Sequence, residues 1–259
     1  MIVSSLVAAL DDRFPFLGAA SWDPVGLQVG SAEAEVGSVA VCHEVSERIV
    51  DAVIDRHMTT VITYHPLLFT PTVRLVSGPT PEGRVLRLVS SGVSVVVIHT
   101  ALDTAMPGTA DFAIENLGWT TTGTFGAVDD GGPHIGRVAT LTEETTAGDL
   151  AGFLADHLSV AVRVADAGRS IGSVAVIPGS GASFLEDAAL HADAIITGDV
   201  SHHRAVAARD AGLSVLDVGH SATERAGVGA LYAAVCEVVP AAVHLADDPT
   251  PWEAMTWNS

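Results

Sequence analysis

Two residue types that bind metal ions stand four positions apart near the end of the chain, His220 and Glu224. They follow a short apolar run, residues 214–218, which predicts a buried strand, and they stand where a helical pattern begins. A spacing of four places an imidazole and a carboxylate on the same face of a helix. The alternative is structural, because Ser221 and Glu224 match a capping box that closes a helix start. On this segment alone the cap is the simpler explanation.

Further candidate ligands follow two other predicted strands. His65 comes directly after one apolar run, and His99 comes after the next, with Asp103 four positions later. In open α/β sheets ligands bind at the carboxyl ends of the strands, so these groups and His220 are expected at the same sheet edge. Imidazole and carboxylate ligands together favour Zn, Fe, Mn, Co or Ni over Mg or Ca. Thr100 and Asp103 also match a capping box, but so many ligands at strand ends favour a metal site.

Other strand ends carry weaker candidates. Asp199, His202 and His203 follow the predicted strand 194–197 and could line a substrate cavity or donate protons, whereas exposure on a helix face is the structural alternative. The glycine-rich segment 178–183 could cradle a phosphate at a helix start, although such segments are more often tight turns. The sequence has no Gly-x-Ser-x-Gly elbow and no evident Cys–His pairing, so nucleophilic catalysis is disfavoured.

The elements that must position these residues alternate between strand and helix along most of the chain. This order predicts an α/β fold with mostly parallel sheets and right-handed crossovers. The acidic, glycine-rich segment 127–133 is the expected linker between two α/β lobes. We therefore predict a first lobe of residues 1–127 plus 220–259 and a second lobe of residues 128–219. The metal site is expected at the strand carboxyl ends, between the lobes.

The composition excludes several classes of function. All 12 basic residues are arginine, and the absence of lysine excludes Schiff-base catalysis and a P-loop. The net charge of -19 argues against direct binding of nucleic acid and draws cations toward the surface. The longest apolar runs, of about eight residues, are too short to cross a bilayer, and we recognise no export signal. Two cysteines, Cys42 and Cys236, fit reduced thiols, so we expect a cytoplasmic protein.

Five segments of the chain, in this order, match the motifs of one known family. They are Trp22-Asp-Pro-Val-Gly-Leu-Gln-Val-Gly30, Thr63-Tyr-His-Pro-Leu-Leu-Phe69, His99-Thr-Ala-Leu-Asp103, Gly198-Asp-Val-Ser-His-His203 and Asp217-Val-Gly-His-Ser-Ala-Thr-Glu224. In these segments the sequence resembles the NIF-three-like family, known as type 2 GTP cyclohydrolase I homologues and as dinuclear-metal-centre hexamers. The resemblance covers most of the chain, and the length is similar to that of the compact members.

The resemblance implies a toroidal homohexamer in which each chain holds two divalent ions at a site facing an internal cavity. The metal ligands that it implies are His65, Asp103, His220 and Glu224. The family usually has two adjacent histidines before the proline of the second motif, and this chain has Tyr64 at the first position. A phenol keeps its proton at neutral pH and is a poor ligand for zinc. We therefore expect Tyr64 and His99 to bind a metal or to lie beside it, with one ion weakly held.

The resemblance also implies a metal-dependent hydrolase of the GTP cyclohydrolase I type 2 kind, acting on a nucleotide or another phosphoester. His99 and His203 are the candidate general acid and base, with His202 as a further choice, and Asp199 and His202 are candidates for a small-molecule substrate cavity. The alternative is a non-enzymatic scaffold or metal-delivery protein, and a third interpretation is an adaptor with a structural metal. An open coordination position would favour catalysis, and a closed one a structural ion.

Overall fold

The computed structural model describes residues 1–246, which fall into two compact units. The first unit comprises Met1–Met106 and the described residues from Gly227 onward, and the second comprises Pro107–Ala226. Helix α9 (His220–Val238) contributes to both units, because the second boundary falls within it. Each unit has its own sheet and its own hydrophobic core, as expected for two α/β lobes.

The first boundary differs from the predicted one because the segment 127–133 is a turn within a sheet. It joins β5 (Thr121–Ala127) to β6 (His134–Thr145), and these two strands pair antiparallel. The N–H of Val128 donates a hydrogen bond to the carbonyl of Pro133 at 3.0 Å and closes the turn. Acidic residues and glycine suit a tight turn as well as a linker, so composition alone does not distinguish the two.

A five-stranded sheet, in the order β1-β4-β3-β2-β11, forms the centre of the first unit. Its strands are β1 (Gly26–Val29), β2 (Val39–Cys42), β3 (Thr60–Thr63), β4 (Ser94–Val97) and β11 (Val243–His244). Neighbouring strands are parallel except for β1 and β4. Every residue of β2, β3 and β4 is buried, which is typical of parallel strands that are covered on both faces.

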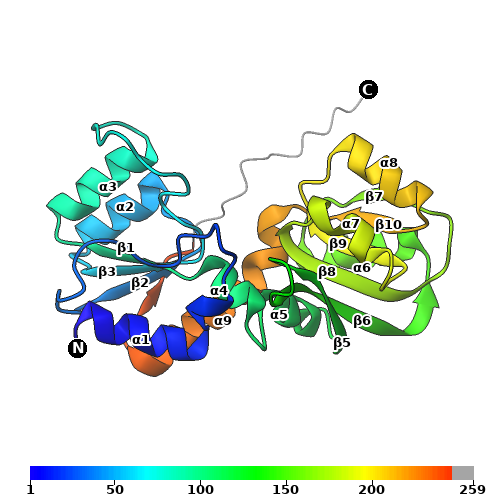
Figure 1. Ribbon diagram of the computed structural model, residues 1–259, viewed down its shortest axis with the longest axis horizontal. Coiled ribbons are helices and arrows are strands. Elements are labelled where there is room, and N and C mark those ends of the chain that lie inside the picture. The colour runs from blue at the N-terminus through cyan, green and yellow to red at the C-terminus, as the bar shows by residue number, and fades with distance from the viewer. Residues whose placement is uncertain (247–259) are drawn as a thin grey trace. The chain divides into compact units, whose positions relative to one another are not determined.

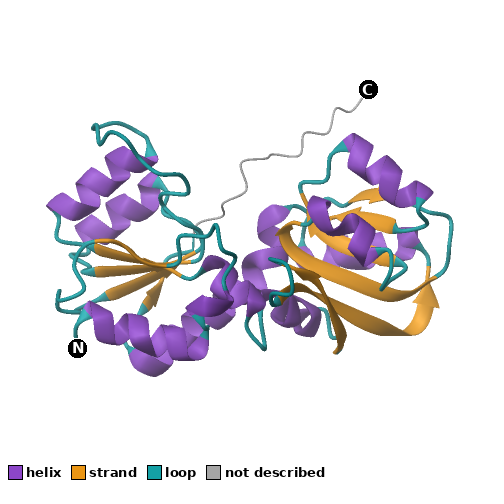
Figure 2. Ribbon diagram, viewed as in Figure 1, coloured by secondary structure: helices purple, strands orange, loops and turns teal. Residues whose placement is uncertain are grey.

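Helices cover both faces of this sheet (Figures 1 and 2). On one face lie α2 (Glu47–Asp55) and α3 (Pro81–Ser90), whose side chains Ile49 and Leu88 enter the core. On the other face lies α1 (Val3–Arg13), at the blue end of the chain in Figure 1. The positions of these helices agree with the hydrophobic periodicity of the sequence.

Two of these helices begin at side-chain caps. The hydroxyl oxygens of Ser46 and Thr80 each accept a hydrogen bond from a backbone N–H three residues later, at 3.2 Å. Pro81 is the first residue of α3, a position at which a helix needs no N–H donor. Local sequence therefore fixes the starts of α2 and α3.

The second unit contains a six-stranded sheet in the order β5-β6-β8-β9-β10-β7. The strands that complete it are β7 (Arg163–Ala165), β8 (Ile171–Ser180), β9 (Ala194–Gly198) and β10 (Ser214–Asp217). β8, β9 and β10 are parallel, and antiparallel strands flank them on both sides. With the parallel sheet of the first unit, this arrangement confirms the α/β fold class. Strand β5 was not predicted, because its threonines and glycines give no apolar run.

Helices also pack on both faces of the second sheet. The core on one face includes side chains of α5 (Thr109–Asn116) and α6 (Ala147–Leu158). The core on the other includes side chains of α7 (Leu185–Ala188) and α8 (His202–Asp210). None of the helices within residues 1–246 is both long enough and apolar enough to cross a membrane.

Candidate metal centre

Histidines follow the carboxyl ends of three adjacent parallel strands, β2, β3 and β4. The backbone N–H of Tyr64 donates to the carbonyl of Cys42 at 3.0 Å, and that of His65 donates to the carbonyl of His43 at 2.8 Å. One strand further, the N–H of His99 donates to the carbonyl of Tyr64 at 3.0 Å. The parallel ladder therefore continues past the ends of the strands and holds these histidines side by side.

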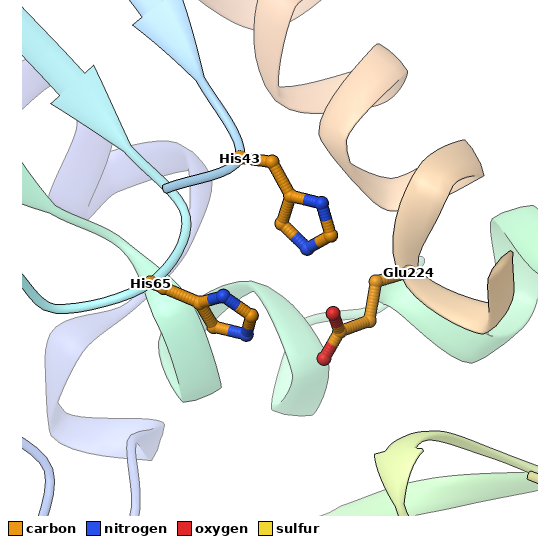
Figure 3. A group of neighbouring side chains, drawn as sticks. All are labelled: His43, His65 and Glu224. Carbon is orange, nitrogen blue, oxygen red and sulfur yellow. The ribbon is translucent and has the colours of Figure 1, made fainter. Parts of the chain in front are cut away.

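The imidazole rings of the three histidines are close neighbours. The ring centroids of His43 and His65 are 4.8 Å apart with nearly parallel planes, and those of His65 and His99 are 5.4 Å apart. Figure 3 shows the first two rings and also draws Glu224 of helix α9, which is described below with its own unit. The sequence analysis assigned no role to His43. Its position directly after the buried run Val39–Cys42 is the signal that would have found it.

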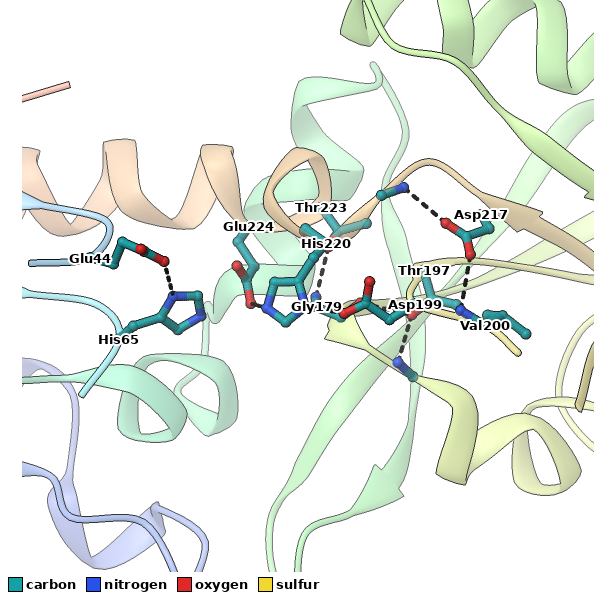
Figure 4. A network of polar contacts seen from close by, with 12 residues as sticks. Glu44, His65, Gly179, Thr197, Asp199, Val200, Asp217, His220, Thr223 and Glu224 are labelled. Carbon is teal, nitrogen blue, oxygen red and sulfur yellow. Dashed lines mark hydrogen bonds and ion pairs between the residues drawn. The ribbon is translucent and has the colours of Figure 1, made fainter. Parts of the chain in front are cut away.

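A carboxylate faces the Nδ1 atom of His65. The Oε2 atom of Glu44 lies 3.8 Å from it, and the interaction with His65 lowers the pKa of the Glu44 carboxyl, although partial burial raises it (Figure 4). A carboxylate on Nδ1 favours the proton on that nitrogen and leaves Nε2 as the atom that binds a metal. Glu44 was also absent from the predicted site, because nothing in its spacing marks it.

Tyr64 and Asp103 are joined by a buried hydrogen bond. The phenol donates to Oδ1 of Asp103 at 2.6 Å, and neither side chain is exposed. Asp103 lies on the short helix α4 (His99–Thr104). The predicted capping box of Thr100 and Asp103 is not formed, because the N–H and the hydroxyl of Thr100 both donate to Asp23. Asp103, a predicted metal ligand, therefore has one of its two carboxylate oxygens hydrogen-bonded to the hydroxyl of Tyr64.

In the second unit, His220 and Glu224 present one donor atom each to the same point. The Nε2 atom of His220 and the Oε1 atom of Glu224 are 3.1 Å apart. The Nδ1 atom of His220 is 2.7 Å from Oδ2 of Asp199, so a carboxylate again occupies that nitrogen (Figure 4). Helix α9 begins at His220, so Ser221 lies inside it and is not the N-cap. The capping-box alternative for this pair is therefore wrong.

The backbone near the end of β8 packs closely against this donor pair. A Cβ atom on Gly179 would lie 2.6 Å from Oε1 of Glu224 and 3.1 Å from Nε2 of His220, so only glycine fits without displacing the donors. The N–H of Gly179 donates to the hydroxyl of Thr223 at 2.7 Å, and that hydroxyl donates to the carbonyl of His220 at 2.7 Å. These contacts fix the first turn of α9 against the end of β8.

Each unit thus has a group of donor atoms, on His43, His65 and Asp103 in the first unit and on His220 and Glu224 in the second. Their chemistry fits a divalent metal ion that is borderline between hard and soft. Each group combines imidazole nitrogen with carboxylate oxygen, which is the ligand set of Zn, Fe, Mn, Co or Ni. Asp199 lies 2.7 Å from Nδ1 of His220 and can orient that imidazole, as is usual for histidines that bind metals, and Glu44 faces Nδ1 of His65 at 3.8 Å. The space that Gly179 leaves open beside Nε2 and Oε1 is also consistent with an ion at those two atoms.

Of the other residues predicted to line a substrate cavity or to act in catalysis, some contact the proposed metal ligands and others do not. Asp199 contacts His220 and so belongs to the group around the metal ligands, not to a separate cavity. His202 and His203 are exposed at the start of α8, with ring centroids 5.2 Å apart, and in the described part of the chain neither makes a hydrogen bond or ion pair. The segment 178–183 is not a phosphate cradle of the predicted kind. Residues 178–180 continue β8, and the N–H of Gly181 donates to Thr197.

The fold and the two donor groups define a two-unit α/β protein with candidate metal-binding chemistry at its strand ends. The sequence profile of the Duf34/NIF3 (NGG1p interacting factor 3) family matches residues 1–249. The chain belongs to this family.

Named relatives and a solved structure agree with this assignment. A GTP cyclohydrolase 1 type 2 homolog of Streptomyces coelicolor is 34% identical over 233 residues, which are 86% of this chain and 81% of the relative. One of Clostridium acetobutylicum is 30% identical over 229 residues, 86% of this chain and 85% of the relative. A Bacillus cereus protein related to NIF3 has a TM-score of 0.85 and 19% identity, and the match covers 98% of this chain and 99% of that one. This last likeness concerns the fold.

Replacing Gly179 tests the packing around the donor pair. We expect Gly179→Ala to lower the free energy of unfolding by about 1–2 kcal/mol, because its φ of +63° disfavours a side chain. It should also weaken the binding of added Mn²⁺ or Zn²⁺, measured by calorimetry, because the new methyl group displaces Oε1 and Nε2. Gly229→Ala is the matched control, since Gly229 lies in α9 with open space around its Cβ position. Equal metal affinity in Gly179→Ala and the unmodified protein would contradict the placement of the ion at these atoms.

Proposed function

We propose that this protein binds two divalent metal ions per chain through His65, Asp103, His220 and Glu224. The observation that carries the proposal is the pair of donors on α9, where Nε2 of His220 and Oε1 of Glu224 lie 3.1 Å apart and Asp199 holds the other imidazole nitrogen. His43 joins the proposed ligands, because its ring lies 4.8 Å from that of His65 at the neighbouring strand end. The ligand types favour Zn, Fe, Mn, Co or Ni.

The reaction that this site supports best is metal-dependent hydrolysis of a nucleotide or another phosphoester. Relatives that are 30% and 34% identical carry the name GTP cyclohydrolase 1 type 2 homolog, which supports this class of substrate. A bound divalent cation supplies Lewis-acid chemistry and lowers the pKa of water. His65, His220 and Glu224 would hold and orient the ion. His99 would exchange a proton at Nε2. His203 and His202 are weaker candidates for proton exchange, because both are exposed and lie outside the hydrogen-bonded groups.

The second candidate function is a metal-binding scaffold or a metal-delivery protein without catalysis. The net charge of -19 favours it, because a strongly acidic surface concentrates cations whatever the reaction. A hydrolysis screen separates the two functions. Turnover of a nucleotide or phosphoester that depends on added metal would establish the enzyme, and tight metal binding without turnover would establish the scaffold.

We also propose a homohexamer in the cytoplasm. The family resemblance supports the hexamer. Cys42 and Cys236 form no disulfide in the described part of the chain, which supports a reducing compartment. Light scattering coupled to gel filtration is expected to give six times the chain mass of 26.6 kDa. A monomer or dimer at every metal loading would overturn the hexamer.

Removing either donor of the α9 pair should remove metal and leave the fold largely intact. We expect His220→Ala and Glu224→Ala to lose most of the metal found by elemental analysis in protein purified without added metal, and to lose any metal-dependent hydrolysis. Their far-ultraviolet circular dichroism should stay close to that of the unmodified protein. Glu237→Ala is the control, since Glu237 is exposed on the same helix. Full metal content in both variants would show that these side chains are not ligands.

The hydrogen bond from Tyr64 to Asp103 predicts unequal affinity for the two ions. Because the phenol keeps its proton and occupies Oδ1 of Asp103, we expect one ion held tightly by His65 and His220 and a second ion easily lost. Mild chelation should therefore remove about one ion per chain. Tyr64→His, which supplies an imidazole, should tighten the second ion about tenfold or more, as measured by competition with a chelator.

Two results would contradict this prediction. Equal, chelator-resistant occupancy of both positions in the unmodified protein would show that Tyr64 does not weaken the second ion. A visible absorption band that disappears in Tyr64→Phe would instead show a phenolate bound to ferric iron.

A further inference from the structure

Asp23 holds the imidazole of His99 from the loop that precedes β1. Its Oδ2 atom lies 2.9 Å from Nδ1 of His99, and it also accepts hydrogen bonds from the N–H of Thr100, at 3.0 Å, and from the Thr100 hydroxyl. That hydroxyl in turn accepts the N–H of Ala20 at 3.0 Å. The carboxylate is fully buried, and among the described residues its other oxygen, Oδ1, receives no hydrogen bond. All of its hydrogen-bond donors therefore lie on the oxygen that faces His99.

His99 is held firmly in one orientation. Its backbone φ of 31° lies in the left-handed region, and only 13% of its side chain is exposed. The rings of Tyr64 and His65 lie 5.5 and 5.4 Å from it, and the rings of Trp22 and Phe69 lie 6.1 and 6.4 Å from it. With Nδ1 bound to Asp23, the nitrogen left for chemistry is Nε2.

The aromatic side chains beside His99 include two that are unusually exposed. Trp22 and Phe69 are each 57% exposed, and their ring centroids are 5.6 Å apart. They form an apolar border on one side of the imidazole. A proton exchanged at Nε2 next to such a border is partly shielded from bulk water, which suits acid–base chemistry on a bound molecule.

We infer that Asp23 is a positioning residue that keeps the proton of His99 on Nδ1 and so presents the unprotonated Nε2 to the substrate as a general base. The catalytic part of this inference rests on the proposed hydrolase function, whereas the carboxylate–imidazole pair does not. The molecule served would be one that gives up a proton in the reaction, such as the attacking water or a hydroxyl or amine of the substrate. Asp23 acts through His99, and among the described residues its carboxylate accepts hydrogen bonds from His99 and Thr100.

The test uses the full chain labelled with ¹⁵N-histidine at about pH 8, where an ordinary imidazole is neutral. Two-bond ¹⁵N–¹H spectra distinguish the two tautomers, and His99→Gln identifies the signals of His99. We expect the unmodified protein to show the Nδ1–H tautomer. In Asp23→Ala no side-chain acceptor is left for Nδ1, so the Nδ1–H signature should be lost. Asp199→Ala is the matched control, because it removes the equivalent carboxylate from His220 and should leave the signals of His99 unchanged.

Several results would overturn the inference. The Nε2–H tautomer in the unmodified protein would do so even if Asp23→Ala failed to fold. An unchanged His99 signature in a folded Asp23→Ala would show that Asp23 only anchors the loop. Metal loss in Asp23→Ala as large as in His220→Ala would make His99 a ligand and not a base. With an active preparation, Asp23→Ala should lower kcat at least tenfold with little change in KM. A failed hydrolase proposal would show separately, as a lack of turnover in the unmodified protein.

Discussion

The parallel hydrogen bonds that continue past the ends of β2, β3 and β4 determine where the chemistry of the first unit lies. These strands are buried on both faces, so an imidazole or carboxylate has no favourable position along them and is tolerated only at their ends. The register pairs Thr63 with both Cys42 and Val97, which brings the residues that follow each strand to the same level. A shift of one residue would turn alternate side chains to the opposite face of the sheet and would separate the histidines. The site is therefore a consequence of the sheet register, and the apolar runs that specify the sheet also specify the site.

A second regularity concerns which nitrogen of each histidine is available. In His65, His99 and His220 a carboxylate oxygen lies near Nδ1, at 3.8, 2.9 and 2.7 Å. The carboxylates come from three unrelated segments, at Glu44, Asp23 and Asp199, so the arrangement does not follow from one repeated motif. For His99 and His220 the carboxylate is within hydrogen-bond distance, and it favours the proton on Nδ1. Burial raises the pKa of Asp23, but its hydrogen bonds with His99 and Thr100 outweigh burial and lower the pKa below its ordinary value. A carboxylate that remains ionised is what this role requires.

The sequence predicted helices and strands well where their hydrophobic pattern was long or continuous. It predicted less well the features that depend on contacts between residues far apart in the sequence. The buried strands that precede His65 and His99, and the caps of α2 and α3, follow from local patterns. The turn 127–133 was mistaken for a linker, because the chain composition does not reveal that the strand after it returns to pair with the strand before it. His43 also follows a buried strand, one residue after Cys42, but it lacked a carboxylate partner at helical spacing. Asp23 and Glu44 depend on contacts 76 and 21 residues apart in the sequence, between Asp23 and His99 and between Glu44 and His65, which no local pattern encodes.

Backbone strain distinguishes the residues at the centre of both donor groups. Among the described residues, four that are not glycine have positive φ: His57, His99, Ser159 and Asp199. His57 and Ser159 follow the ends of α2 and α6, where a left-handed residue commonly ends a helix. His99 and Asp199 instead stand within two residues of a strand end. Each conformation costs about 1–3 kcal/mol, which glycine would largely avoid. A glycine there would have no side chain to place on Asp23 or on His220. The contacts of these side chains therefore explain why the chain has histidine and aspartate, and not the more stable glycine, at the two positions. The backbone strain is located where we propose that metal and proton chemistry occur.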